Sequence, residues 1–253
     1  MRWLRTRRDV VLLYHAVGLA PATGDPDNLY VDTETFRRQL AYIRRRADVV
    51  PLREVASSRR SGPRQRVAVT FDDGFRSVLL NAAPVLEEFA LPATLFMPTG
   101  AVRADGPTGD PVEKLSRDEL LALQAHGVEI GSHGHAHIDL AAAEADVTRD
   151  DLATSYRLLT EWLGSPPLHL AWPFGRSSAA ARDAAKELGF VAAFATERSP
   201  AGDFARERVG VYPRDSFARF VLKASGRYGP LRRGAAVLER GLVRSKASSG
   251  LRG

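Results

Sequence analysis

Short apolar segments alternate with longer amphipathic segments along most of this 253-residue chain. The short segments, such as Val10–Tyr14 and Arg66–Phe71, have the length and composition of buried strands. One of the longer segments carries Phe36, Leu40 and Ile43 at the spacing of one helical face. Strands that alternate with helices in this way form a parallel sheet. Six to eight such units predict a (β/α) barrel, and an open doubly wound sheet is the alternative.

Capping signals support this interpretation. Asp32 or Thr33 is expected to cap the first long helix, and Ser116 with Glu119 forms a capping box for another. Further strands are expected at Leu91–Met97, Val128–Gly131, Leu168–Trp172, Val191–Thr196 and Val209–Val211, and further helices at Ser77–Phe89, Asp146–Leu163, Ser178–Leu188 and Phe217–Ala224. Chemically suggestive residues follow several of these strands, at the rim where barrels build active sites.

The composition indicates one globular domain. Apolar residues make up 44% of the chain and charged residues 26%, which excludes global disorder. We expect a single catalytic domain over residues 10–226, between a basic segment at 1–9 and a basic tail at 227–253, with a loop at 105–111 inside the domain. Without cysteines the chain has no disulfides or thiolate metal sites. We detect neither a signal peptide nor a membrane span, so we expect a cytoplasmic protein.

The positive charge is concentrated at the two ends of the chain. Residues 227–253 contain seven Arg or Lys and one Glu, which accounts for the net charge of +6. The rest of the chain is balanced, and this argues against a nucleic-acid partner, which would need a basic stripe on the folded body. The tail is expected to be helical and then disordered, and contact of the basic ends with an anionic membrane surface is the alternative to a solvated tail.

Two motifs carry metal chemistry. Thr70–Gly74 reads Thr-Phe-Asp-Asp-Gly, and Ser132–His137 reads Ser-His-Gly-His-Ala-His. A carboxylate and two imidazoles are a usual ligand set for a hydrolytic divalent metal, with zinc as the first expectation and cobalt, nickel or iron as alternatives. His133 and His137 share one side on either a strand or a helix, whereas His135 shares it only on a strand. An Asp-Asp-Gly turn that caps a helix is the structural alternative for the first motif.

Together with Pro173-Phe-Gly175 at a later strand end, these motifs resemble the polysaccharide deacetylases with a NodB homology domain, carbohydrate esterase family 4. The resemblance covers about residues 10 to 225. It implies a distorted (β/α)₇ barrel and a hydrolase that removes acetyl groups from sugars. It also implies that Asp72 is the catalytic base, that Asp73, His133 and His137 bind the metal, and that the groove wall is formed by Trp172, Pro173, Phe174 and Gly175.

Three residues depart from the family pattern. Gly134 replaces a Ser or Thr between the two ligand histidines, and Ala171 replaces the Arg that orients the base, so another group must hold Asp72. No histidine follows His169, although the family's general acid is a late histidine. His15 ends the first strand, which adjoins the last strand in a closed barrel, and we expect His15 to be the acid. This layout resembles the circularly permuted poly-N-acetylglucosamine deacetylases.

The sequence therefore predicts an enzyme in which a metal activates water, Asp72 takes a proton from it and His15 protonates the departing amine. The partner is an acetylated carbohydrate. Two alternatives remain open: a metal-dependent amidase for a non-sugar amide, and a catalytically impaired, glycan-binding relic of the fold.

Overall fold

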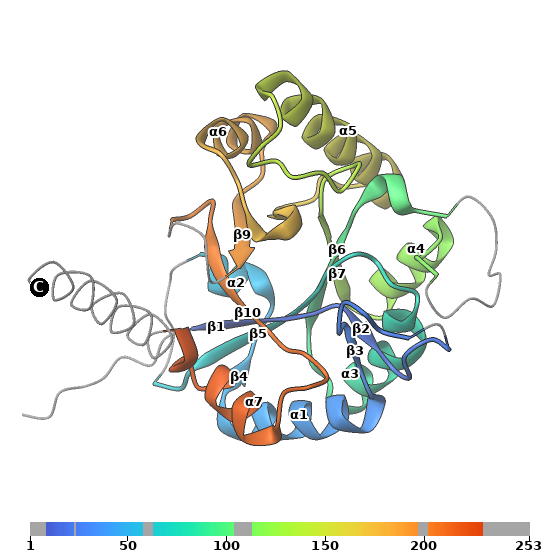
Figure 1. The fold of residues 1–253 in the computed structure, drawn as a ribbon, viewed down its shortest axis with the longest axis vertical. Helices are drawn as coiled ribbons and strands as arrows, with labels where there is room; N and C mark the ends of the chain where they lie inside the picture. The colour runs from blue at the N-terminus through green and yellow to red at the C-terminus, as the bar shows by residue number, and fades with distance from the viewer. Residues whose placement is uncertain (1–8, 23, 58–62, 104–112, 197–201, 230–253) are drawn as a thin grey trace, which may run out of the picture.

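Seven parallel strands close into a barrel at the centre of the described part of the chain, which comprises residues 9–22, 24–57, 63–103, 113–196 and 202–229 of a computed structural model (Figure 1). The pairing of β1 with β5 closes the ring. In their order around the barrel the strands are β1 (Val10–Tyr14), β10 (Arg206–Gly210), β9 (Ala192–Thr196), β8 (His169–Ala171), β7 (Val128–Ser132), β6 (Ala93–Met97) and β5 (Arg66–Phe71).

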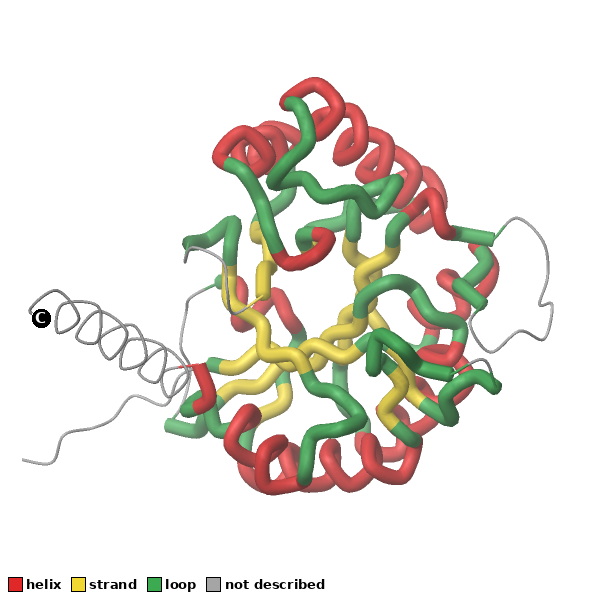
Figure 2. The backbone as a smooth tube through the Cα atoms, viewed as in Figure 1, coloured by secondary structure: helices red, strands yellow, loops and turns green. Residues whose placement is uncertain are grey.

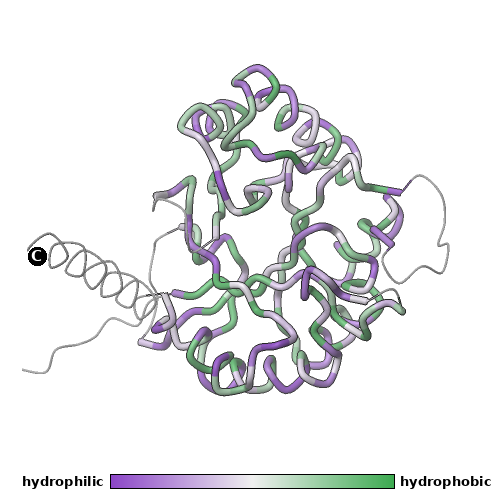
Figure 3. The backbone as a smooth tube through the Cα atoms, in the orientation of Figure 1, coloured by the Kyte–Doolittle hydropathy of each residue, from purple (hydrophilic) through white to green (hydrophobic). Residues whose placement is uncertain are grey.

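Helices surround these strands, as Figure 2 shows. They are α1 (Thr33–Arg46), α2 (Leu52–Ala56), α3 (Ala83–Phe89), α4 (Arg117–Ala125), α5 (Ala145–Leu163), α6 (Ala179–Leu188) and α7 (Phe217–Ala224). Three short turns of helix, η1 (Val78–Ala82), η2 (Thr99–Ala101) and η3 (Pro173–Gly175), and three two-residue strands, β2 (Ala16–Val17), β3 (Tyr30–Val31) and β4 (Asp48–Val49), complete the described elements. The helices alternate between hydrophilic and hydrophobic residues along their length, as expected for helices with one face on a core (Figure 3).

Alternation along β5 separates the outer core from the barrel interior. Val67 and Phe71 join a cluster that includes Phe36 of α1, between the strands and the helices. Ala68 belongs to a different cluster, and the Thr70 hydroxyl receives a hydrogen bond from Arg208 of β10. The next residue with the orientation of Ala68 and Thr70 is Asp72, so the strand delivers this carboxylate to the interior at its C-terminal end.

The expected barrel is confirmed, as are the caps at Asp32 and Ser116. The last strand differs from the prediction, because β10 begins at Arg206 rather than at residue 209. Its first three residues are Arg, Glu and Arg, and such a charged run does not read as a strand. The helix expected at residues 77–89 starts with the π-helical turn η1. No described helix is long and apolar enough to span a membrane. Residues 1–8, 104–112 and 230–253 lie outside the described residues, and with them most of both basic ends and the expected loop at 105–111.

Candidate active site

The two adjacent aspartates sit where β5 gives way to a turn. Asp73 has a φ of +68° and Gly74 a φ of +62°, so the backbone leaves the extended conformation directly after Asp72. A Cβ at Gly74 would lie 1.9 Å from the Met97 sulfur, so any other residue there would have to displace the Met97 side chain and adopt a strained φ. This turn cancels the alternation of a regular strand. Both carboxylates can therefore reach the same group of histidines.

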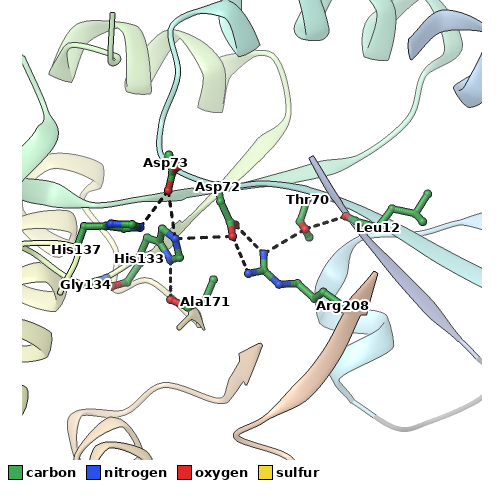
Figure 4. Close-up of polar contacts among 10 residues, drawn as sticks. Leu12, Thr70, Asp72, Asp73, His133, Gly134, His137, Ala171 and Arg208 are labelled. Carbon is green, nitrogen blue, oxygen red and sulfur yellow. Dashed lines mark hydrogen bonds and ion pairs between the residues drawn. The ribbon is translucent and has the colours of Figure 1, made fainter. Parts of the chain in front are cut away.

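Asp73, His133 and His137 converge as a metal site requires. The Nε2 atoms of His133 and His137 lie 3.4 and 3.2 Å from Oδ1 of Asp73 (Figure 4). One ligand atom from each of the three residues lies within 4.8 Å of the other two. Nδ1 of His133 is 2.8 Å from the carbonyl oxygen of Ala171, which fixes this nitrogen as the donor and leaves Nε2 free for a metal. The donor set and its convergence fit a divalent ion such as zinc.

The electrostatics of this cluster favour positive charge. Burial acts to raise the pKa of Asp73, but hydrogen bonds from His133 and His137 and the charge of His133 outweigh it and hold that pKa far below its usual range. Burial acts to lower the pKa of His133, yet the carboxylates of Asp72 and Asp73 raise it overall. A cation at this position, whether a proton or a metal, relieves the repulsion between the two aspartates.

The third histidine of the motif points elsewhere. Nδ1 of His135 lies 2.9 Å from the hydroxyl oxygen of Thr99 in η2, and His135 is not among the converging ligands. The sequence left open whether the three histidines lie on a strand or on a helix. They lie in a turn instead, in which Gly134 and His137 both have positive φ. His133 and His137 face Asp73, whereas His135 ties the loop to η2.

Arg208 holds Asp72 from β10, which is separated from β5 only by β1. Its Nη1 and Nη2 atoms donate to Oδ1 and Oδ2 of Asp72 at 2.6 and 2.7 Å, and the guanidinium is fully buried (Figure 4). Burial acts to raise the pKa of Asp72, but the charges of Arg208 and His133 keep it below its ordinary value. The carboxylate is thus ionised and fixed in orientation, as a general base needs to be.

Arg208 is the functional residue that sequence reasoning missed. Ala171 lies on β8 and its methyl group cannot reach Asp72, so the family's Arg at this position is absent. Arg208 binds Asp72 in its place. The available signal was the alternation of Arg206 and Arg208 in a segment that precedes two apolar residues. It was overlooked because β10 was expected to start only at residue 209.

His15 follows β1 directly and lies beside Asp72. Tyr14 is in register with Phe71, and the Asp72 amide donates to the Tyr14 carbonyl at 3.0 Å, so the next residues along the two strands are neighbours. Burial lowers the pKa of His15, with partial opposition from the charges of Asp72 and Asp73. The first strand therefore brings an imidazole to the site, in agreement with its expected location.

The expected groove wall is only partly available to a ligand. Trp172 is fully buried and its indole N–H donates to the Phe204 carbonyl, so its ring is not available to stack on a sugar. Pro173 and Gly175 are also buried. Phe174, in contrast, is 58% exposed with a φ of +56°, and its ring lies 4.9 Å from that of His137. Phe174 is the aromatic face of this segment that a substrate can contact.

A family model described as polysaccharide deacetylase matches residues 59–193, more than half of the chain. The chain belongs to the polysaccharide deacetylase family. It is 24% identical over 229 residues to "Putative polysaccharide deacetylase YxkH" of Bacillus subtilis, a match that covers 86% of this chain and 77% of the relative. It is also 24% identical over 209 residues to the poly-beta-1,6-N-acetyl-D-glucosamine N-deacetylase of Escherichia coli, covering 66% of this chain and 31% of that protein.

A solved protein structure has a similar fold. The structure of IcaB from Ammonifex degensii superposes with a TM-score of 0.73 and 25% sequence identity, covering 87% of this chain and all of that one. The chain thus spans most of the Bacillus relative but less than a third of the Escherichia coli enzyme. The predicted NodB-type barrel and the resemblance to the poly-N-acetylglucosamine deacetylases are both confirmed.

Proposed function

We propose that this polysaccharide deacetylase family member is a metal-dependent hydrolase that removes the acetyl group from N-acetylated amino sugars. The observation that carries the proposal is the position of Asp72 between two sets of groups. One set, formed by Asp73, His133 and His137, has the donors of a hydrolytic metal site. The other is Arg208, which keeps Asp72 ionised and oriented. A base held beside a metal site is what amide hydrolysis by water requires.

The metal ligands are Asp73, His133 and His137 in this proposal, and zinc is the first expectation, with cobalt, nickel and iron as alternatives. A divalent metal at this point supplies a Lewis acid for the acetyl carbonyl and a water of lowered pKa. Asp72 removes a proton from the attacking water. Its lowered pKa keeps it in the basic form at neutral pH. Arg208 prevents the carboxylate from rotating away, because both oxygens are held by one planar guanidinium.

His15 is the general acid in this proposal. The nitrogen of the sugar leaves as an amine, and it must receive a proton as the bond to the acetyl carbon breaks. The lowered pKa of His15 makes its protonated form a strong donor, although it also lowers the fraction protonated at neutral pH. Asp72 lies next to it along the paired strands, so a proton taken by the base can be passed on within the site.

N-acetylated glucosamine polymers or oligomers are the proposed substrate class. The supporting facts are the family and the names of two relatives, a polysaccharide deacetylase and a poly-beta-1,6-N-acetyl-D-glucosamine N-deacetylase. Exposed Phe174 beside His137 offers a stacking face for a sugar ring. Arg208 also weakens the case for a glycan-binding relic, because it supplies the arginine that position 171 lacks.

Acetate release tests the proposal. The metal-loaded protein is incubated with β-1,6- and β-1,4-linked N-acetylglucosamine oligomers and with a simple non-sugar acetamide, beside Asp72→Asn and a chelator-treated sample. Release from the sugars that is lost in both controls is the expected result. Release only from the non-sugar acetamide would assign the amidase instead. A protein that binds metal but releases no acetate from any of them would contradict the enzymatic assignment and favour a glycan-binding role.

A further inference from the structure

The loop from His133 to His137 carries two of the proposed metal ligands in an unusual backbone conformation. Gly134 has a φ of +74° and His137 a φ of +53°. The left-handed region is uncommon for residues other than glycine, and a residue stays in it when the surrounding structure holds it there. The direction in which His137 points at Asp73 therefore depends on whatever holds the loop between the two histidines.

A buried carboxylate from α5 holds one side of this loop. Oδ2 of Asp151 accepts the backbone N–H of His135 at 2.8 Å, and Oδ1 accepts that of Ala136 at 2.7 Å. Asp151 is only 6% exposed, so water competes little for these bonds. Both oxygens are used on consecutive amides, which fixes the position and the tilt of the peptide planes. Hydrogen bonds to an ionised acceptor are stronger than neutral ones.

Backbone groups hold the other side. The amides of Thr99 and Gly100 donate to the carbonyl oxygens of Gly134 and His135 at 3.1 and 2.9 Å. The loop is therefore fixed between the start of η2 and the side chain of Asp151. The main-chain bonds cannot be removed by substitution, whereas the Asp151 bonds can.

The position of the Asp151 carboxylate requires a glycine at position 134. A Cβ at position 134 would lie 2.6 Å from Oδ2 of Asp151, closer than such contacts occur. A hydroxyl-bearing side chain at 134 and this carboxylate position cannot coexist without a shift. The bonds that fix the ligand loop in this chain come from α5 rather than from a side chain within the loop.

We propose that Asp151 is a positioning residue for the metal site, which fixes the His133–His137 loop so that both imidazoles converge on Asp73. This inference rests on the proposed function only in that Asp73, His133 and His137 bind a metal. Asp151 itself does not touch the metal. It sets the affinity by keeping the ligands in place before the metal arrives, because an unfixed loop would have to be ordered on binding.

The test is the Zn²⁺ affinity of the full chain, measured by competition with a chromogenic chelator, for wild type, Asp151→Asn and Asp150→Asn. Asparagine offers one acceptor oxygen and turns an N–H₂ group toward the other amide. Asp150 is the adjacent helix residue and is exposed, so it is the matched control. We expect affinity to fall roughly 10- to 100-fold for Asp151→Asn, the usual effect of losing a residue that orients a ligand. Asp150→Asn should bind as wild type does.

Two readouts separate positioning from a general loss of structure. The Tm and far-UV circular dichroism of the metal-free variants report folding, and the visible spectrum of the Co²⁺-substituted protein reports ligand geometry. Should Asp151→Asn fail to fold, Gly134→Ala perturbs the same loop, since its methyl group pushes against Oδ2 of Asp151 and alanine is strained at a φ of +74°. It should lower affinity and alter the Co²⁺ spectrum. Equal Zn²⁺ affinity in folded Asp151→Asn and wild type would overturn the inference, whereas a wild type that binds no Zn²⁺ or Co²⁺ would overturn the proposed metal site instead.

Discussion

Arg208 and Asp72 form a bidentate ion pair in the barrel interior, with both donor–acceptor distances below 2.8 Å. The pair joins β10 to the end of β5, the two strands that flank β1, and the Thr70 hydroxyl lies 3.4 Å from the same guanidinium. Buried pairs of this kind contribute modestly to stability, because the attraction only offsets the cost of removing two charges from water. Its effect on the orientation and ionisation of Asp72 is the functional consequence.

Replacing Arg208 should therefore change the pH profile of the enzyme as well as its rate. In Arg208→Met the main favourable charge beside Asp72 is lost, so the pKa of Asp72 rises. A base is inactive once protonated, so the acidic limb of kcat/KM should move to higher pH. Because the carboxylate is no longer held in one orientation, kcat should also fall about 100-fold, the usual effect of a misplaced catalytic group. Arg208→Lys should not restore activity fully, since an ammonium cannot make two parallel bonds.

Arg206→Gln is the control for that experiment. Arg206 lies on the same strand but binds the Val55 carbonyl and Asp203, away from Asp72. Its replacement can lower the Tm but should leave the acidic limb unchanged. An acidic limb that stays in place in Arg208→Met would refute the proposed electrostatic role of Arg208.

The two histidines that follow Gly134 should behave differently toward metal. His137→Gln removes a proposed ligand, and Zn²⁺ affinity should fall by at least about 100-fold, to that of a two-ligand site. His135→Gln removes only the contact with the Thr99 hydroxyl. We expect it to retain most of the affinity. Isothermal titration with Zn²⁺ distinguishes the two, and equal losses would mean that the ligand set differs from Asp73, His133 and His137.

Replacing His15 should affect substrates according to their leaving group. An amine must be protonated to leave, whereas 4-nitrophenolate leaves without a proton. His15→Gln should therefore lower kcat for an N-acetylglucosamine oligomer by roughly 10²- to 10⁴-fold, the range for loss of a general acid. Hydrolysis of 4-nitrophenyl acetate should decrease far less, and Zn²⁺ affinity should not change. An equal decrease for both substrates would show that His15 is not the acid.

Most of the barrel could be predicted from the sequence because most of its strands are predominantly apolar runs, with β10 as the exception. The convergence of Asp73, His133 and His137 could also be predicted, because the three residues follow strands whose C-terminal ends meet at one rim of the barrel. Arg208 could not be predicted, because its partner Asp72 is 136 positions away and the local spacing of Arg206 and Arg208 does not distinguish a buried arginine from an exposed one. The burial of Trp172 was equally hidden, since its partner carbonyl at Phe204 belongs to a distant loop.

Phe174 should contribute to substrate binding rather than to chemistry. Its exposed ring beside His137 can stack on a sugar, and contacts of aromatic rings contribute about 1 kcal/mol. Phe174→Ala should therefore raise KM for N-acetylglucosamine oligomers roughly fivefold with little change in kcat or Zn²⁺ affinity. Leu80→Ala removes a similarly exposed apolar side chain from η1 and is the control. A KM equal to that of wild type in Phe174→Ala would place the sugar elsewhere.

The N-cap of α1 gives a pH-dependent contribution to stability that is independent of the active site. Oδ1 of Asp32 accepts the amides of Thr35 and Glu34 at 2.9 and 3.0 Å. Hydrogen bonds, first of all from Thr35, lower its pKa below the ordinary 3.8. A lowered pKa means that the ionised form is stabilised by folding, so the contribution is complete well above pH 3.8 and is lost as the pH falls below that value.

Asp32→Ala should lower the free energy of unfolding by about 1 kcal/mol at pH 7 and by less near pH 3. Asp32→Asn keeps a capping oxygen and should lose less at pH 7, and chemical denaturation of the metal-free protein at both pH values measures the difference. An equal loss for Asp32→Ala at pH 7 and pH 3 would mean that the charge of the cap adds nothing to its hydrogen bonds.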